Sequence, residues 1–168
     1  DPKVFWYQDV DGNGHWVMVL AAGYGVMFYT SPDMKAWTPS GRFGYDLPAN
    51  GGIWETPDLF ELIVEETGET RWVLTVGIGE GSPVGEMGVQ YFVGAFDGQT
   101  FKSENQPDLV LWADRGWDFY AAQSWSDVPN GRRIWLGWMT NWLYARDVPT
   151  MPWRGSMTVP RELRLVQT

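Results

Sequence analysis

The chain has 168 residues, of which 44% are hydrophobic and 16% aromatic, and its formal net charge is −9. This length fits one domain, and the hydrophobic content is too high for a disordered chain. The 12 Lys and Arg residues are outnumbered by 21 carboxylates. Because nucleic acids and anionic membranes are bound through basic residues, neither is expected as a partner, and a neutral ligand fits better.

The sequence contains no cysteine and a single histidine, His15. Disulfides, thiolate chemistry and multi-histidine metal sites are therefore excluded, as is a Ser-His-Asp triad built on any other histidine. No apolar run approaches the ~20 residues that a membrane-spanning helix needs. We expect neither a metal nor another cofactor.

Short aromatic and β-branched runs separated by Gly and Pro predict strands joined by tight turns. No segment predicts more than a single turn of helix. The predicted strands fall into three units: 3–7, 15–23 and 25–31; then 57–62, 71–77 and 88–94; and finally 118–125, 133–139 and 155–159, followed by 162–166.

The three units form an internal repeat with a period of about 60 residues, marked by Trp16, Trp72 and Trp135. This period, with three or four strands in each unit, suits the blades of a β-propeller. A β-sandwich also has closely spaced strands, but they need no such self-similarity. We therefore predict an all-β fold, a partial β-propeller in a single domain. Its approximate blades are 1–50, 51–112 and 113–168.

Each unit carries a carboxylate just before or at the start of its first strand, namely Asp1, Glu55 and Asp118. In a propeller the first strand of every blade lines the central channel, so equivalent positions of neighbouring blades converge at one mouth. The repeat thus predicts that carboxylates far apart in the chain meet there. The alternative is that each acid only caps a turn, as Asp often does.

Five short motifs, in the same order along the chain, resemble those of glycoside hydrolase family 32, the β-fructosidases. Residues 1–6 (DPKVFW) resemble the family's Arg-Asp-Pro motif without its Arg. Residues 54–60 (WETPDLF) resemble its Trp-Glu-Cys-Pro-Asp-Leu-Phe motif. The segments that look like the family's later blades are 118–123, 135–139 and 153–163. Together these motifs cover essentially the whole chain.

The resemblance implies a five-bladed propeller that hydrolyses β-fructosides such as sucrose, inulin or levan with retention at the anomeric carbon. Carried over by motif, Glu55 is the general acid/base and Asp1 stabilises the transition state. Trp54 and Trp142 are predicted to line the substrate site, although for any single Trp the alternative is a place in the aromatic core. A carbohydrate ligand is expected, with no metal or other cofactor. Many family members are secreted, which is an association only, so the compartment stays open.

Two departures from the family pattern bear on activity. Thr56 stands where the family has Cys, and the Trp-Met-Asn-Asp-Pro-Asn-Gly motif that carries the family nucleophile is absent from the sequence. A retaining mechanism needs that second carboxylate, so we expect little or no activity from these 168 residues alone.

Three interpretations therefore stay open. The chain is a piece of an enzyme that acts only at full length, a carbohydrate-binding partial propeller without catalysis, or one that assembles with another copy to complete a site. Because a partial propeller leaves apolar blade faces open, we also expect either self-association into a homo-oligomer through those faces or closure into a smaller ring.

Overall fold

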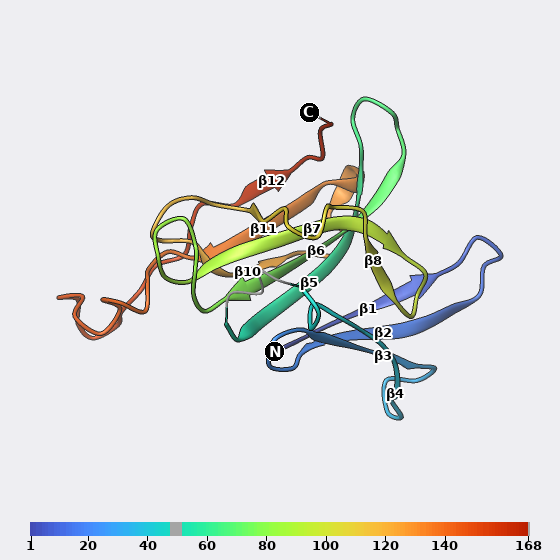
Figure 1. Ribbon diagram of the computed structural model, residues 1–168, viewed down its shortest axis with the longest axis horizontal. Helices are drawn as coiled ribbons and strands as arrows, with labels where there is room; N and C mark the ends of the chain where they lie inside the picture. The colour runs from blue at the N-terminus through green and yellow to red at the C-terminus, as the bar shows by residue number, and fades with distance from the viewer. Residues whose placement is uncertain (48–51, 168) are drawn as a thin grey trace.

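The computed structural model describes residues 1–47 and 52–167. Within these residues the regular structure is twelve strands and one short 3-10 turn at Pro129–Gly131. The strands form three antiparallel sheets that follow one another along the chain (Figure 1). The predicted all-β fold is confirmed. No helix in this part of the chain is long and apolar enough to cross a membrane.

Every sheet is an up-and-down meander, with one exception in the second sheet, whose last strand pairs with the strand two places before it in the chain. The first sheet contains β1 (Pro2–Gln8), β2 (Gly14–Ala21), β3 (Val26–Ser31) and β4 (Thr38–Phe43). The second contains β5 (Trp54–Ile63), β6 (Thr70–Ile78), β7 (Gly88–Phe96), β8 (Phe101–Ser103) and β9 (Leu111–Trp112). The third contains β10 (Tyr120–Ser124), β11 (Arg133–Trp138) and β12 (Arg161–Leu163).

The prediction of a strand at 155–159 is wrong. Only Met157 forms an isolated bridge there, and β12 takes the third place in the sheet. Two local features interrupt the ladder. Gly155 has a φ of 87°, in the left-handed region, and the side-chain hydroxyl of Thr158, rather than a main-chain carbonyl, accepts the hydrogen bond from the Gly137 amide.

The second sheet packs against the first sheet on one face and against the third sheet on the other, so both of its faces are buried. Successive side chains of each strand point alternately to these two faces. Along β6, Leu74 and Val76 pack toward the first sheet, whereas Val73 and Thr75 face the third sheet. The larger core, between the first two sheets, is formed by Val17, Val19, Val26, Phe28, Trp54, Leu59, Leu74, Val76, Ile78, Phe92, Phe96 and Phe101. A smaller core against the third sheet is formed by Met87, Val89, Phe119, Tyr120, Ala122 and Trp135.

A buried polar cluster joins the first strands of all three sheets. The Lys3 Nζ on β1 lies 3.1 Å from Asp58 Oδ1 on β5 and donates a 2.9 Å hydrogen bond to the Ser124 carbonyl on β10. The Ser124 amide in turn donates a 2.6 Å hydrogen bond to Asp58 Oδ2. Because Asp58 is 0% exposed, its charge depends on these two partners for compensation.

We expect Lys3→Met to cost about 3–5 kcal/mol of stability, because it leaves the Asp58 carboxylate buried without its counter-ion. The matched control is Glu65→Gln, which breaks the exposed Arg164–Glu65 ion pair and should cost less than about 1 kcal/mol. Urea unfolding of both variants measures the difference. Equal losses would contradict the role given to the buried cluster.

The Glu61 carboxyl on β5 makes the stability of the fold depend on pH. Burial raises the pKa of Glu61, and the nearby Arg133 charge partly offsets this. The folded protein therefore holds this proton more tightly than the unfolded chain, so its contribution to stability falls as pH rises from about 4.3, the ordinary Glu pKa, through the raised value.

We accordingly expect Glu61→Gln to be more stable than the parent at pH 7 and to lose this advantage below about pH 4, where the parent carboxyl is also neutral. Thermal unfolding between pH 4 and 8 tests this. An advantage that does not change with pH would contradict the assignment.

Candidate active site

Glu55 is the second residue of β5, and its side chain is exposed. Its Oε2 accepts a 2.8 Å hydrogen bond from the hydroxyl of Tyr120, the first residue of β10 in the neighbouring sheet. Burial raises the pKa of the Tyr120 hydroxyl, and the hydrogen bond to Glu55 and the charge of Glu55 raise it further. Tyr120 is therefore a neutral donor that orients Glu55 at any pH near neutrality.

Matching β-bulges set up this pair of side chains. The register of β5 shifts between Glu55 and Asp58, with Thr56 at a φ of 44°. The register of β10 shifts in the same way after Tyr120, with Ala121 at a φ of 48°. A bulge re-aims the side chains beside it, so both strands turn the residue before the bulge toward the same site.

The bulges also correct the register expected for the acids. By its position before the bulge, Tyr120 is the β10 counterpart of Glu55, and Asp118 lies two residues earlier in the chain. The Asp118 carboxylate accepts a hydrogen bond from the Tyr144 hydroxyl. The prediction that Asp118 is equivalent to Glu55 is therefore wrong.

Gly77 on β6 makes room for the Glu55–Tyr120 pair. It is the cross-strand partner of Glu55, and a Cβ at this position would lie 3.0 Å from the Tyr120 hydroxyl and 3.0 Å from Thr56 Oγ1.

The role of Tyr120 was missed from the sequence. A signal was nevertheless present, since residues 119–120 (FY) occupy the place in the repeat that residues 54–55 (WE) occupy one unit earlier.

Thr56, in place of the family's Cys, presents its main chain rather than its side chain for hydrogen bonding. Its Oγ1 is buried and has no hydrogen-bond partner among the described residues. The Gln123 side-chain amide donates to the carbonyls of Thr56 and Pro57, at 3.0 and 3.2 Å. These bonds satisfy main-chain acceptors that the bulge removes from the ladder.

Asp1 is exposed and directly precedes β1. Lys3, two residues further on, contacts Asp58, which is three residues after Glu55. Because β1 and β5 run in the same direction (Figure 1), Asp1 and Glu55 lie at the same end of neighbouring strands. The stabilisation of the transition state by Asp1 stays a prediction.

Trp142 lies on the long connection between β11 and β12, which projects at the left of Figure 1, where β5 and β10 begin. The buried Asn141 anchors this loop, since its side chain donates to the Trp117 carbonyl at 2.9 Å and accepts from the Leu143 amide at 3.0 Å. The Trp142 ring packs 4.8 Å from that of Trp138 and is 60% exposed. An exposed ring at this end is compatible with the predicted contact with substrate.

Trp54 occupies a different environment. Its indole is buried in the larger core, where it stacks on Phe92 at 5.6 Å, and Gly44 leaves it space. This position favours the packing role that the sequence left as the alternative. Contact between Trp54 and substrate stays a prediction without support from its surroundings.

The residues described contain no group of three or more His, Cys, Asp or Glu side chains that could hold a metal ion.

Over its whole length, residues 1–168, the sequence matches the family described as Glycosyl hydrolases family 32 N-terminal domain. The chain belongs to this family. It is 55% identical to a levanase of Bacillus subtilis over 98% of the chain and 24% of that protein. It is 40% identical to the extracellular exo-inulinase inuE of Aspergillus niger over 98% of the chain and 32% of that protein. The chain thus spans about a quarter to a third of these relatives.

The fold comparison agrees. The solved structure of fructofuranosidase from Schwanniomyces occidentalis complexed with fructose has a TM-score of 0.88 and 37% identity, covering 100% of this chain and 32% of that one. The predicted family and propeller fold class are confirmed.

We expect Gly77→Ala to lower the stability by about 1–3 kcal/mol, because the added methyl must displace Tyr120 and Thr56 in a packed region. Gly79→Ala, one residue beyond the end of β6, is the control. A Cβ at Gly79 would meet only ordinary contacts at 3.6 Å or more. Urea unfolding measures both. If the two variants lose the same stability, Gly77 does not serve to accommodate Tyr120.

Proposed function

We propose that this chain contributes the general acid/base, Glu55, to a retaining hydrolase of β-fructosides of the sucrose, inulin or levan type. The observation that carries the proposal is an exposed carboxylate held by a neutral tyrosine from the adjacent sheet. The relatives named levanase and exo-inulinase, and the solved neighbour complexed with fructose, support a fructoside as the ligand.

Cleavage of a glycosidic bond builds negative charge on the leaving oxygen and positive charge on the sugar ring. With Tyr120 bound to Oε2, the other oxygen of Glu55 faces the substrate and donates its proton to the leaving oxygen. The Glu55 carboxylate that forms keeps the Tyr120 hydrogen bond, which is stronger to a charged acceptor. Tyr120 thus positions the acid before bond cleavage and stabilises its conjugate base afterwards.

Asp1 and Trp142 complete the share of the site proposed for this chain. An ionised Asp1 at the same end of the strands accepts hydrogen bonds from fructose hydroxyls and stabilises the developing positive charge. The exposed Trp142 ring offers an apolar face to the sugar. No step in this scheme needs a metal.

The nucleophile is the part that these residues do not supply. Retention needs a second carboxylate roughly 5 Å from the acid, on the other side of the sugar. In this proposal it comes either from residues of a longer chain or from a carboxylate of a second copy. Val4 and Trp6, exposed on the outer face of β1, belong to the kind of open blade face at which either would pack.

The direct test is Glu55→Gln in the full-length protein, with sucrose, inulin and levan as substrates. We expect kcat to fall by about 10²–10⁴-fold, the range of general acid–base catalysis, with an unchanged melting temperature. Glu162→Gln on β12 is the control and should leave activity within about twofold of the parent. Full activity of Glu55→Gln would refute the assignment.

Calorimetry on the same Glu55→Gln protein separates hydrolysis from simple binding. Fructan binding that persists in the variant, with hydrolysis lost, supports the enzyme. Fructan binding by a parent protein that shows no hydrolysis would instead favour the carbohydrate-binding propeller.

A further inference from the structure

Asp118 is a carboxylate at the beginning of the third unit that the proposed chemistry does not use. It is exposed, lies two residues before Tyr120, and accepts a hydrogen bond from the Tyr144 hydroxyl. Tyr144 belongs to the long connection between β11 and β12, 26 residues further along the chain. The bond therefore ties the beginning of β10 to the connection that carries Trp142.

This connection has little regular structure of its own. Its two ends are joined where the Met139 amide donates a 2.8 Å hydrogen bond to the Ser156 carbonyl and where Met157 bridges Trp138. Residues 140–155, all of them described, form turns and bends but no strand. The position of a side chain on this connection is therefore set by individual hydrogen bonds and not by a strand ladder.

Trp142 lies between two residues that are tied to the same short segment before β10. On one side of it in the chain, the buried Asn141 side chain donates a 2.9 Å hydrogen bond to the Trp117 carbonyl. On the other side, the Tyr144 hydroxyl donates to the Asp118 carboxylate. Trp117 and Asp118 are adjacent residues, so the turn that carries Trp142 is held at both of its ends by one place in the fold.

Hydrogen bonds within the turn connect these two anchors. The Tyr144 amide donates to the Asn141 carbonyl at 3.1 Å, and the Leu143 amide donates to the Asn141 side-chain oxygen at 3.0 Å. The Trp142 ring lies 4.8 Å from the Trp138 ring and is 60% exposed. Because an exposed side chain with one ring contact can change rotamer, a turn fixed at both ends narrows the orientations open to the Trp142 ring.

The same segment before β10 also holds the candidate acid. Tyr120, two residues after Asp118, donates its hydroxyl proton to the hydrogen bond with Glu55. Asp118 thus acts on the ring of Trp142 through Tyr144, and Tyr120 acts on the carboxyl of Glu55. Two groups from distant parts of the chain are thereby placed relative to one another by residues 117–120, and such placement is what a bound substrate requires.

The Asp118–Tyr144 bond lies at the surface, where Tyr144 is 36% exposed. A hydrogen bond between exposed groups adds little to the stability of a fold, because water takes the place of a lost partner. The bond to Asp118 raises the pKa of Tyr144 to about 12, so the hydroxyl keeps its proton near neutral pH. Removing this bond therefore leaves the fold intact and changes the order of the turn that it holds.

We propose that Asp118 and Tyr144 are positioning residues, whose hydrogen bond orders the turn that carries Trp142 and so sets how tightly the protein binds the fructosyl ring. This inference rests on the proposed function, in which Trp142 offers its ring to a fructoside. Neither Asp118 nor Tyr144 touches the reacting atoms. Loss of their bond adds an ordering cost to substrate binding and leaves proton transfer from Glu55 unchanged, so it raises KM and not kcat.

The experiment measures kcat and KM for sucrose and inulin with variants of the full-length protein. Tyr144→Phe removes the hydroxyl and keeps the ring, and it should raise KM about twofold to tenfold, the effect of one hydrogen bond, with kcat and melting temperature unchanged. Asp118→Asn keeps an oxygen that accepts from Tyr144 and should raise KM less than Asp118→Ala does. The control is Asp147→Asn, which removes an exposed charge from the same connection and should leave both constants within about twofold of the parent.

Two further measurements test whether Tyr144 acts through Trp142. In a Trp142→Ala background, Tyr144→Phe should no longer change KM, because the turn then has no ring to place. The indole N–H resonance of Trp142, assigned with Trp142→Phe, reports the surroundings of the ring without any substrate. It should shift or broaden in Tyr144→Phe and stay unchanged in Asp147→Asn.

The inference is overturned if Tyr144→Phe leaves KM or the Trp142 resonance unchanged, or if it lowers kcat instead. A rise in KM from Asp118→Ala that persists in the Trp142→Ala background would also overturn it, because Asp118 would then contact the sugar directly. None of these outcomes bears on Glu55. Full activity of Glu55→Gln refutes the proposed acid and leaves the KM comparison valid, whereas a parent that neither binds nor hydrolyses a fructoside overturns both proposals.

Discussion

The buried pair of Lys3 and Asp58, extended to the main chain of Ser124, is the contact on which the rest of the arrangement depends. It joins the first strand of each sheet at one level. A shift of the pairing register by one residue turns every side chain of a strand to the opposite face. A charge without exposed surface has few acceptable positions. We infer that this cluster selects the register in which Glu55 and Tyr120 meet.

The candidate site is built from departures from regular strand geometry. Thr56 is β-branched yet has a φ of 44°, and Ala121 repeats this conformation at 48° in the neighbouring sheet. Such positions are costly for residues with a Cβ and are tolerated where the surroundings hold them. Here Gln123 bonds to the displaced carbonyls and Gly77 leaves space for Tyr120. The strain is therefore located where it aims a carboxylate out of the sheet.

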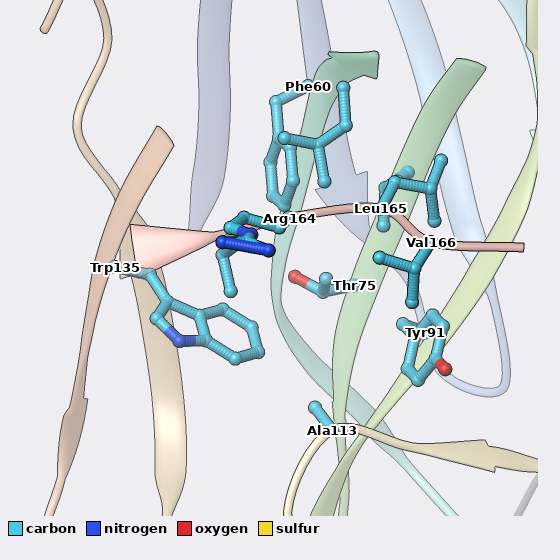
Figure 2. A pocket seen from close by; sticks show the side chains of 11 residues that line it. Phe60, Thr75, Tyr91, Ala113, Trp135, Arg164, Leu165 and Val166 are labelled. Atoms are coloured by element: carbon cyan, nitrogen blue, oxygen red, sulfur yellow. The ribbon is translucent and has the colours of Figure 1, made fainter. Parts of the chain in front are cut away.

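The two faces of the second sheet are packed unequally. Toward the first sheet, Trp54, Phe92 and Phe96 fill the space between the layers with stacked and tilted rings. Toward the third sheet, which contains the short β12, a pocket of about 200 Å³ remains beside Thr75 and Trp135 (Figure 2). The two faces of the same strands thus differ in how completely the neighbouring sheet fills the space beside them.

The sequence by itself determined the all-β propeller class, most of the strands and the family, because alternation, turn residues and short motifs are local properties. It misplaced the strand at 155–159, where Thr158 bonds the Gly137 amide through its side chain. It also missed Tyr120 as the partner of Glu55, 65 residues away. Only the packing of the first two sheets against each other places Trp54 in the buried core. Burial and cross-sheet hydrogen bonds depend on how separate units pack, and that information is absent from any one segment.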